Sequence, residues 1–557
     1  MRFRDIVFPE GGKVRNTLRD VNKKIKVVLK APEESKDTTY WKIMERLEPK
    51  PKELKNQKKT KFKIQPKISI VVIDSDNATL KNKRTLLKSI KKQTYSNWEI
   101  CNINKIDINK IKNVVTGDYI TIIGTNDILP RFCLYEFVKA INQCPKMELI
   151  YSDADHFIKN LQNRIQPEFK PDFSMDLLRC NNYIYNMFLA KKELLKKIDD
   201  SKSIYDLIFR LCEKTDQIGH IQKVLYHSRI DEIQNKIDSK EDIEAIEAHL
   251  QRVNLKGQAK ETTIDGIYDV KYEVIGAPKV TILIPNKDEK ETLQTCINSI
   301  LNKTTYENFE IAIIENNSTS KEIFDYYNEL EQNDKIQILK YPKKEFNYSK
   351  IINYGVKNTD GEFIIQLNND TELITKNWIE KMIGYAQRKE VGAVGVRLYY
   401  PDMSLQHGGV VLGLGGVAGH RFLYLPKDKH ANFNLEMKTS DLVAVTAACI
   451  ASRREVYEKV GYMNEDLAVA FNDVDFCLKI REAGLKIIYN PFVEILHYES
   501  KTRGKENSPE KQQRFSDEID TFMRKWGGTV GKGDPYYNKN FYIPEMEVEE
   551  NTIQTTI

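Results

Sequence analysis

The sequence predicts an α/β fold with two related domains, and three observations lead to this prediction. At 557 residues the chain is longer than a single hydrophobic core supports. Residues 66–100 and 278–311 repeat one pattern, PKISIVVI…TYSNWEI in the first copy and PKVTILIP…TYENFEI in the second. In both copies short apolar runs alternate with amphipathic stretches, which is typical of a mostly parallel sheet covered by helices. The repeat is much longer than a solenoid unit, so it indicates two domains.

The predicted elements follow in the same order in both copies. Short β-branched runs are suited to buried parallel strands, and the longer stretches between them have helical spacing. In the first copy we expect strands at 68–73, 98–103 and 119–124, and helices at about 79–93 and 130–143. In the second copy we expect strands at VTILIP, FEIAIIE and EFIIQL, and helices through 297–301 and at 320–331.

This order divides the chain into five segments. The predicted segments are a basic helical extension and linker at 1–65, a first domain at 66–235, a connecting segment at 236–277, a second domain at 278–530 and an irregular tail at 531–557. The connecting segment begins with a helix whose faces are charged, at about 239–253. The composition of the tail is typical of partly disordered chain.

The composition is that of a soluble globular protein, with 41% hydrophobic and 30% charged residues. No apolar run approaches the ~18 residues of a membrane-spanning helix. The start, MRFRDIVFPEGG, lacks the apolar stretch of a signal peptide. The eight cysteines stand singly, with no CxxC pair. This favours reduced thiols in a cytoplasmic protein over a disulfide framework or a structural zinc site.

The net charge of +6 is unevenly distributed along the chain. Residues 1–67 hold 20 Lys and Arg against 9 Asp and Glu, so they carry +11, while the remainder carries −5. One interpretation is a solvated helix and linker. The other is a segment attracted to an anionic membrane face or a polyanionic partner. Few aromatic residues interleave with these charges and no reader motif is present, which argues against nucleic acid.

Polar residues stand directly after a predicted strand of the second copy. The strand EFIIQL ends in Asn368-Asn369-Asp370. Ligands of open parallel sheets bind beyond the carboxyl ends of the strands, so this cluster is placed for chemistry. The structural alternative is a turn that uses Asn and Asp as turn formers.

Two further groups in the second copy have chemical potential. Asn472 or Asp473 would cap the amphipathic helix that follows AFNDVD, and a helix N-terminus stabilises an ionised carboxylate. An ionised, positioned carboxylate is a competent general base, and simple capping is the alternative. His497 ends the strand VEIL and could bind a divalent metal ion together with a carboxylate oxygen of Asp370; a structural histidine is the alternative.

These elements, in this order, resemble the family 2 glycosyltransferases with the GT-A fold. FNYSKIINYGVKNTDGEFIIQLNNDTEL is similar to the run that leads into the DxD motif of that family, and AFNDVDFCLKIREAGLKIIYNP is similar to its catalytic-base motif. QHGGVVLGLGGVAGHRF resembles a segment common in bacterial members that build surface polysaccharides. The resemblance spans about 66–530 and implies two tandem GT-A domains, each Rossmann-like with a mostly parallel sheet.

The resemblance implies a role for each candidate residue at the reacting centre. Asp370 matches the last acid of the DxD motif, which binds the Mn²⁺ or Mg²⁺ held by the diphosphate of the donor. His497 matches a late position that contacts the metal or the diphosphate. Asp473 matches the base that deprotonates the acceptor hydroxyl. In such a site the cation offsets the charge that develops on the leaving nucleoside diphosphate, and one in-line displacement inverts the anomeric centre.

The resemblance also implies which residues bind the donor, with two departures from the family pattern. Pro285, Glu315 and Asn316 match the loops that contact the nucleoside, and Asn368 and Asn369 belong to the same donor site. Asn368 stands where the first acid of the DxD motif usually lies. Glu315-Asn316 stands where an Asp pair is more usual.

The glycine-rich stretch from Gly408 to Gly419 has two interpretations. It contains GLGGVA, a loose match to a dinucleotide-binding loop. However, it follows the metal motif instead of opening the first βα unit, and it lacks GK[ST]. A flexible loop that shapes the acceptor side is the favoured interpretation, and a phosphate cradle is the alternative.

The first copy has lost the acids that the family would need. Aligned on Gly117 and Gly361, the first copy has Gly124 and Asn126 at the two acid positions, and Asp127 lies one residue past the second. A shift of one residue along an extended strand turns a side chain to the other face. Ile204 stands at the base position. Asp153, Asp155 and His227 remain without an assigned role, and the alternative is an active site that works without metal.

We therefore expect an inverting glycosyltransferase of the hexosyltransferase type with an inactive first domain and an active second domain. Its substrates would be a nucleotide-sugar donor and a saccharide or lipid-linked saccharide acceptor in cell-surface polysaccharide synthesis. The expected location is the cytoplasm at the inner face of the membrane, with peripheral contact through residues 1–65. The rival interpretations are a bifunctional polymerase with two active sites and a non-catalytic carbohydrate-binding scaffold.

Overall fold

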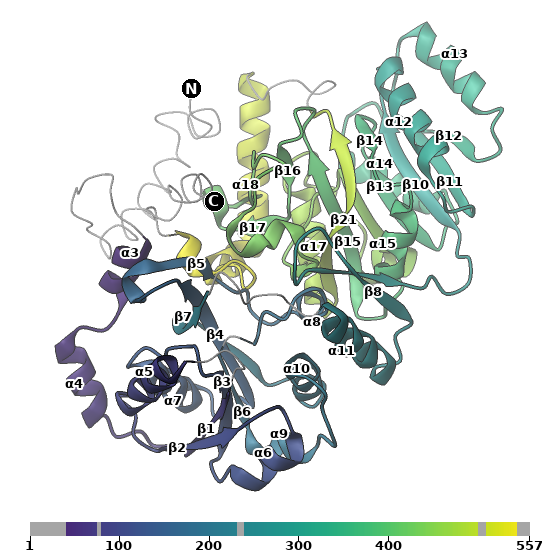
Figure 1. Cartoon of the computed structure of the whole chain (residues 1–557). Helices are drawn as coiled ribbons and strands as arrows, with labels where there is room; N and C mark the ends of the chain where they lie inside the picture. The colour runs from purple at the N-terminus through teal and green to yellow at the C-terminus, as the bar shows by residue number, and fades with distance from the viewer. Residues whose placement is uncertain (1–39, 75–78, 186, 231–238, 500–507, 543–557) are drawn as a thin grey trace. The chain divides into compact units, whose positions relative to one another are not determined.

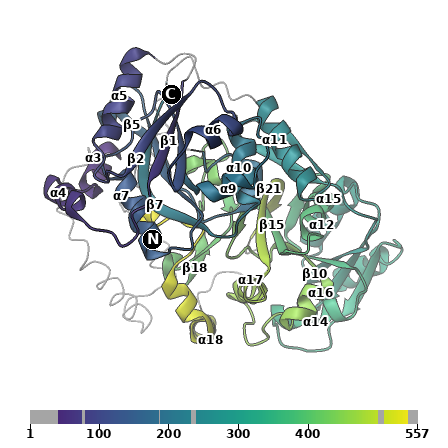
Figure 2. The ribbon, with the colours of Figure 1, turned by 90° about the horizontal axis from the view of Figure 1, so that it is seen from below.

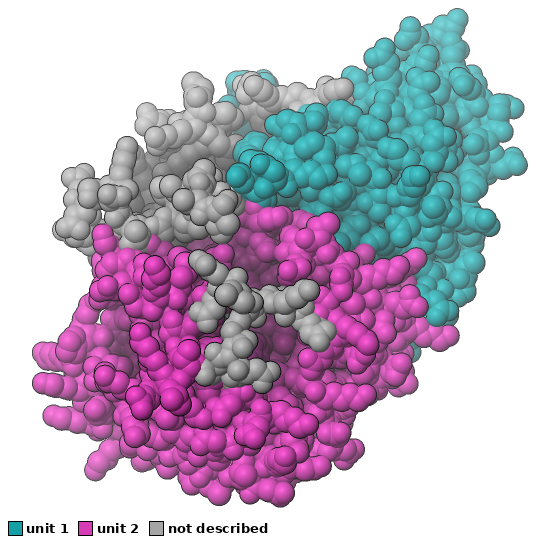
Figure 3. Space-filling model, in the orientation of Figure 1, with its two compact units in different colours: residues 1–36, 273–429, 439–534 teal, residues 37–272, 430–438, 535–557 magenta. Residues whose placement is uncertain are grey.

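The computed structural model describes residues 40–74, 79–185, 187–230, 239–499 and 508–542, which form two compact units (Figure 3). The first domain is the described part of 37–272, 430–438 and 535–557, and the second domain is the described part of 273–429 and 439–534. Most of the predicted basic extension and the end of the predicted tail therefore lie outside the described residues.

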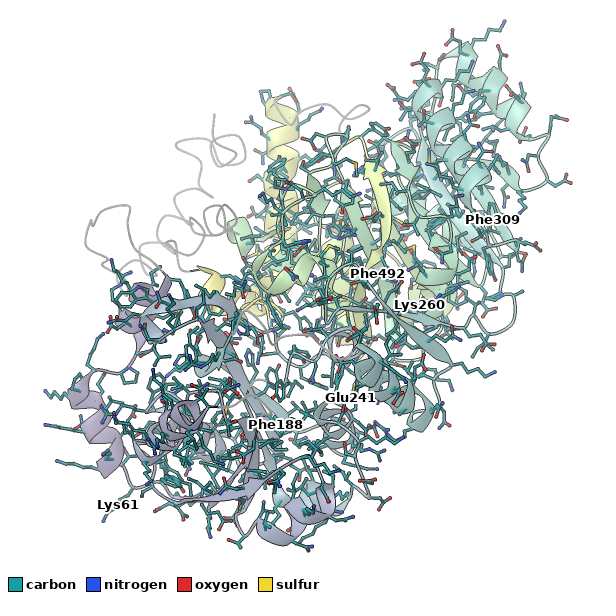
Figure 4. The ribbon with its side chains drawn as sticks, in the orientation of Figure 1. Lys61, Phe188, Glu241, Lys260, Phe309 and Phe492 are labelled. Atoms are coloured by element: carbon teal, nitrogen blue, oxygen red, sulfur yellow. The ribbon has the colours of Figure 1, made fainter. Side chains whose placement is uncertain are left out.

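A seven-stranded sheet forms the centre of the first domain (Figure 1). Its strands are β1 Ile68–Ile73, β2 Trp98–Ile103, β3 Tyr119–Gly124, β4 Leu149–Phe157, β5 Arg164–Glu168, β6 Phe188–Lys191 and β7 Ile218–Arg229. The order is β2-β1-β3-β6-β4-β5, with β7 also paired to β4. The first three strands are parallel, and β6 is antiparallel to both of its neighbours. Phe188, labelled in Figure 4, is fully buried in β6.

Amphipathic helices cover this sheet. They are α5 Leu80–Lys91, α6 Ile108–Val114, α7 Cys133–Gln143, α8 Met175–Cys180, α9 Lys192–Lys196 and α10 Ile204–Cys212. Leu86 and Ile90 of α5 and Phe137 of α7 pack into one core with Ile70 of β1. The helical spacing of these apolar residues is what predicted the helices, because it places them on the face toward the sheet.

Two stretches that the sequence suggested as linkers are built into the first domain. The helices α3 Tyr40–Leu47 and α4 Pro51–Lys59 precede β1, and the Tyr40 hydroxyl donates to Asp155 Oδ2 at 2.9 Å. In the connecting segment, α11 Ser239–Arg252 is followed by the hairpin of β8 Gly257–Glu261 and β9 Tyr268–Tyr272. The ring of His249 in α11 stacks on that of Phe209 in α10, with 4.4 Å between centroids. These segments therefore belong to a packed unit.

A ten-stranded sheet forms the centre of the second domain. Its strands are β10 Val280–Asn286, β11 Phe309–Glu315, β12 Ile336–Lys340, β13 Phe363–Leu367, β14 Thr371–Leu373, β15 Val391–Tyr399, β16 Leu405–His407, β19 Ser440–Leu442, β20 Cys449–Arg453 and β21 Lys486–His497. The order is β12-β11-β10-β13-β20-β15-β21-β14, with β16 on β15 and β19 on β21. The first four strands are parallel, so their carboxyl ends share one edge.

Seven helices are assigned in the described part of the second domain. They are α12 Lys290–Lys303, α13 Lys321–Leu330, α14 Tyr348–Lys357, α15 Trp378–Ala386, α16 Arg454–Val460, α17 Asn472–Glu482 and α18 Pro509–Lys532. Figure 1 shows α12 and α13 beside β11 and β12. Among all described residues, no helix has both the length and the apolar character needed to cross a membrane.

The two domains repeat one topology. The order β2-β1-β3-β6-β4-β7 in the first matches β11-β10-β13-β20-β15-β21 in the second. Even small contacts recur, because the Gly117 N–H donates to Ser69 Oγ at 2.9 Å and the Gly361 N–H donates to Thr281 Oγ1 at 3.1 Å. A Cβ atom would lie only 2.5 Å from Lys67 O at the first glycine and 2.2 Å from Thr281 Oγ1 at the second. The predicted α/β fold class is confirmed.

Candidate functional site

One asparagine connects the ends of three parallel strands in the second domain. Asn286 ends β10, and its backbone oxygen accepts from the Asn316 N–H at 2.8 Å, just beyond β11. Its Oδ1 accepts from Nδ2 of Asn369, beyond β13, at 2.6 Å. Its own Nδ2 donates to the Tyr327 hydroxyl at 2.7 Å. Sequence reasoning missed Asn286, although a polar residue that closes the run VTILIP was a usable signal.

The predicted donor residues gather around this asparagine. Pro285 directly precedes it in β10, Glu315 ends β11 and Asn316 follows, and both of these last residues are buried. Glu315 Oε1 accepts from the Ser318 N–H at 2.5 Å, so one carboxylate oxygen fixes the loop. The structure thus brings together the predicted residues from all three strand ends, as expected for parallel strands.

Asp370 and His497 are in direct contact. Asp370 Oδ1 lies 3.1 Å from His497 Nε2, and both residues are buried. The backbone holds them together. Thr371 of β14 pairs with His497 of β21, and the Tyr498 N–H donates to the backbone oxygen of Asp370 at 2.9 Å. Asn368 Nδ2 lies 3.2 Å from His497 Nε2. The first acid position of the motif therefore also faces this pair, but with an amide.

Gln406 in β16 fixes the orientation of the His497 ring. Its Nε2 donates to Glu499 Oε2 at 3.0 Å, and its Oε1 lies 2.6 Å from His497 Nδ1. Because an amide oxygen only accepts, Nδ1 carries a proton, and in the neutral ring Nε2 is the nitrogen left to bind a metal ion. A histidine whose Nδ1 is held by a hydrogen bond while its Nε2 lies beside a carboxylate has the arrangement of a metal ligand. Sequence reasoning missed Gln406, which lies far from His497 in the chain.

The donor set of this pair fits a divalent ion. A carboxylate oxygen suits Mn²⁺ or Mg²⁺, an imidazole nitrogen is a common ligand of first-row transition metals, and the amides of Asn368 and Gln406 contact His497. Within the described residues, no group of three or more His, Cys, Asp and Glu side chains is arranged to hold a metal. Asp370 and His497 could therefore supply two ligands, and a bound substrate would have to supply others.

Asp473 lies in the first turn of α17, but it does not cap that helix. The N-cap residue is Phe471, which has a left-handed backbone with φ of 59° and makes no side-chain cap, so the predicted cap at Asn472 or Asp473 is wrong. Asp473 Oδ1 instead accepts from the Val474 N–H at 2.8 Å, and Oδ2 accepts from the Ala447 N–H at 3.2 Å. Two backbone amides therefore hold this carboxylate in a fixed direction at the start of α17.

The loop before Asp473 is held by α18. Glu518 is buried, and its carboxylate accepts from the Val469 N–H at 2.7 Å and the Ala470 N–H at 3.1 Å. The Phe471 ring packs against those of Phe515 and Phe522 at 5.8 and 5.4 Å. Figure 2 shows α17 and α18 side by side. No sequence motif indicated this support, because a helix about 45 residues away supplies it.

The glycine-rich stretch forms a hairpin. β17 Val410–Leu412 pairs with β18 Ala418–His420, and Gly413, Gly415 and Gly416 in the connection all have positive φ. Glycine suits this tight turn, because residues with a side chain rarely adopt a positive φ. Because the stretch opens no α-helix, it lacks the N-terminal amides of a phosphate cradle.

In the first domain the equivalent acids are engaged in internal bonds. Ile128 bridges His227 as Thr371 pairs with His497, so Asp127 stands where Asp370 stands relative to the histidine. Its side chain, however, accepts from the Tyr226 hydroxyl at 2.5 Å and from Ser228 Oγ at 3.2 Å, and burial raises its pKa. Asp127 therefore faces the residues that flank the histidine and not the histidine itself.

The other acids of the first domain are also enclosed. Asp155 Oδ1 lies 2.5 Å from His227 Nδ1, and Asp153 accepts from Nδ2 of Asn538 at 2.9 Å. Asp206 pairs with Arg210 at 2.9 Å. Ile204, at the predicted base position, begins α10 with an apolar side chain. The tail, predicted to be irregular, thus contributes a buried asparagine to this network.

Comparisons with known proteins identify the second domain. Residues 281–461 match the family model described as Glycosyl transferase family 2. The chain is 33% identical over 538 residues to the uncharacterized protein y4gI of Sinorhizobium fredii, covering 86% of this chain and 58% of that protein. It is 35% identical over 444 residues to the O-antigen biosynthesis protein RfbC of Myxococcus xanthus, covering 77% of this chain and 34% of that protein. The chain thus spans only part of either relative.

Solved structures align over about half of this chain at lower identity. GalNAc-T7 with UDP, GalNAc and Mn²⁺ aligns at 15% identity with a TM-score of 0.38, over 46% of this chain and 50% of that one. The mannosyltransferase PcManGT from Pyrobaculum calidifontis, in complex with GDP-Man and Mn²⁺, aligns at 15% identity with a TM-score of 0.33, over 45% of this chain and 65% of that one.

Proposed function

We propose that this chain, which belongs to the family 2 glycosyltransferases, inverts the anomeric centre as it transfers a sugar from a nucleotide-sugar donor to a saccharide or lipid-linked saccharide acceptor. The observation that carries the proposal is the contact of 3.1 Å between Asp370 Oδ1 and His497 Nε2. It lies directly after β13, at the strand edge where Asn286 gathers the predicted donor residues.

The donor would bind at this strand edge. Pro285, Glu315 and Asn316 would contact the nucleoside, and Asn368 and Asn369 would face the diphosphate. Asp370 and His497 would hold Mn²⁺ or Mg²⁺, with Gln406 keeping the His497 lone pair directed toward the ion. Such an ion, when bound, offsets the negative charge that develops on the leaving diphosphate.

Asp473 would act as the general base. Its carboxylate takes the proton of the acceptor hydroxyl, the acceptor oxygen forms a bond to the anomeric carbon, and the bond from that carbon to the diphosphate breaks. The nucleoside diphosphate leaves with the electron pair. A single displacement of this kind inverts the configuration. The two backbone amides on Asp473 support this role, since they fix the direction of the carboxylate.

The first domain would be catalytically silent. The internal bonds of Asp127, Asp153 and Asp155 support this, because Asp127 accepts from Tyr226 and the carboxylate that contacts His227 is that of Asp155, at Nδ1. The product would be a surface polysaccharide or its lipid-linked precursor, in line with the name of the Myxococcus relative. The enzyme would work in the cytoplasm at the inner membrane face, with its basic residues 1–65 in peripheral contact.

A donor panel tests the proposed function. Purified full-length protein is incubated with individual nucleotide sugars and Mn²⁺, and release of the nucleoside diphosphate is measured with and without saccharide acceptors. We expect hydrolysis of one donor and faster turnover with an acceptor, both lost in Asp370→Ala. No turnover with any donor, or equal turnover in Asp370→Ala, would contradict the proposal. A product with two alternating linkages would indicate that the first domain is also active.

A further inference from the structure

The glycine-rich hairpin brings two histidines together beside the proposed centre. His420 ends β18, and the pairing of Val410 with His420 returns it to the beginning of the hairpin, next to His407. Nδ1 of His407 lies 2.9 Å from Nδ1 of His420, and their rings are nearly perpendicular. Gly409 permits this return because it has no side chain. A Cβ atom at this position would lie 2.2 Å from Leu442 Cδ1.

The hydrogen-bond directions in this pair determine where each proton lies. The Thr446 backbone N–H lies 3.4 Å from His407 Nε2, and a backbone amide only donates. His407 Nε2 is therefore the acceptor, and the proton of the neutral ring is on Nδ1. That Nδ1–H donates to His420 Nδ1, so the neutral His420 carries its proton on Nε2.

The surroundings keep His407 neutral and leave the other edge of His420 available. His407 is fully buried, and burial holds its pKa well below the usual range, with the charges of His420, Arg421 and His497 acting in the same direction. His420 is only partly buried. The Thr446 N–H donates to His407 and the adjacent Ala447 N–H donates to Asp473 Oδ2, so the histidine pair lies beside the proposed base. Burial lowers the pKa of His420, and the negative charge of Asp473 opposes this.

We propose that His407 fixes His420 in its Nε2–H form, and that this N–H donates a hydrogen bond to the acceptor saccharide beside Asp473. The inference rests on the proposed function, since it assigns the binding of the acceptor to that same site. His420 is then an acceptor-binding residue and His407 is a positioning residue. The Nε2–H of His420 holds an oxygen of the acceptor saccharide in place, and the adjacent carboxylate of Asp473 receives the proton of the attacking hydroxyl.

The tautomers can be tested without any activity. In full-length protein labelled with ¹⁵N and ¹³C histidine, the ring nitrogen shifts distinguish a protonated nitrogen from an unprotonated one. We expect His407 to carry its proton on Nδ1 and His420 on Nε2, with assignments from His407→Gln and His420→Gln. A proton on His407 Nε2 or on His420 Nδ1 would overturn the pair, whether or not a donor sugar has been found.

Kinetics with the donor and acceptor identified by the panel test the role in binding. His420→Leu should lower kcat/KM for the acceptor roughly 3- to 15-fold, the range of one lost hydrogen bond, mainly through KM. Donor affinity and donor hydrolysis in water should change less than about 2-fold, since neither needs the acceptor. His420→Gln keeps an N–H donor and should recover most of the loss.

Variants of His407 separate positioning from mere packing. His407→Gln can accept from Thr446 and donate to His420, so it should keep the acceptor KM near that of the wild type. His407→Leu fills similar space without either bond and should raise that KM as His420→Leu does. His430→Gln, at a histidine of the first domain, is the control and should leave the kinetics unchanged. Equal KM values in His420→Leu and wild type, or equal effects of the Gln and Leu variants, would overturn the proposal. If the wild type itself showed no turnover, this would count against the proposed function and not against the tautomers of His407 and His420.

Discussion

Replacing the proposed base by its amide, Asp473→Asn, separates its chemical role from its structural one. In the wild type each carboxylate oxygen accepts one backbone N–H, from Val474 and from Ala447. An amide has one oxygen, so one of these N–H groups would face the NH₂ of the new side chain. Ala447 is buried, so an unpaired amide there costs about 1–3 kcal/mol. Loss of the negative charge at the helix N-terminus adds about 0.3–1 kcal/mol.

The effect on catalysis should be much larger than this loss of stability can explain. A lost general base lowers kcat by roughly two to four orders of magnitude, which is about 2.7–5.4 kcal/mol of activation free energy. The assay is transfer of labelled sugar to the acceptor under saturating donor, at a temperature where the variant is fully folded. Donor affinity, measured by titration, should stay within about 3-fold of the wild type.

A matched control lies two residues away. Asp475 is buried in the same helix, where its Oδ1 accepts from Trp526 Nε1 at 2.8 Å and pairs with Lys525 at 3.1 Å. Asp475→Asn should lower the free energy of unfolding by about as much as Asp473→Asn, yet retain kcat within about 3-fold. If Asp473→Asn retained kcat within 10-fold, or if both variants lost activity in proportion to their stability, the assignment of the base would be refuted.

Four further predictions concern the proposed metal pair, a buried lysine, the first domain and the basic residues at the start of the chain. Gln406→Leu should free the His497 ring and raise the Mn²⁺ concentration for half-maximal activity roughly 10- to 100-fold, and full activity in excess chelator would exclude the metal role. Burial lowers the pKa of Lys438 to about 7, below its ordinary 10.5, so the unfolded chain binds the extra proton and stability should rise with pH from about 7 to 10. Lys438→Met should remove that contribution, and equal slopes of Tm against pH in both proteins would contradict it. Asp127→Asn should lower Tm, because it disturbs the bond from the Tyr226 hydroxyl, but leave the linkage and the rate per folded molecule unchanged, whereas a lost linkage would mean that the first domain works. Deleting residues 1–39 should weaken recovery with anionic vesicles more than turnover, by up to ~1 kcal/mol for each basic residue removed, and unchanged recovery would contradict the membrane contact.

The parts that local pattern determines could be predicted from the sequence. The runs around Ile70 and Ile282 have the β-branched character of buried parallel strands, and they are β1 and β10 in the structure. The sequence predicts that Asp370 and His497 bind one metal ion, because each stands at or just after the end of a strand, and the structure places the two side chains in contact. Local pattern worked here because a buried strand fixes both its own position and that of the residue that ends it.

The parts that depend on distant contacts could not be predicted. Gln406 orients His497 across about 90 residues, and Glu518 holds the loop before Asp473 across almost 50. Neither contact leaves a periodic signal in the sequence. The capping prediction failed for a related reason, since Phe471 takes the N-cap position because its ring packs on α18, and this packing outweighs the usual preference for a polar cap.

The divergence of the two copies has a simple geometric cause. Between the matched glycines, Gly117 and Gly361, and the residue bridged to the histidine, the first copy has one residue more than the second. The extra residue moves Asp127 back into line with the bridge, but its carboxylate bonds to the side chains on either side of His227. His227 in turn bonds to Asp155, which also accepts from the Tyr40 hydroxyl. Creating a contact like that of Asp370 with His497 would therefore require more than a new acid, because His227 would first have to be released from the network that now stabilises the domain.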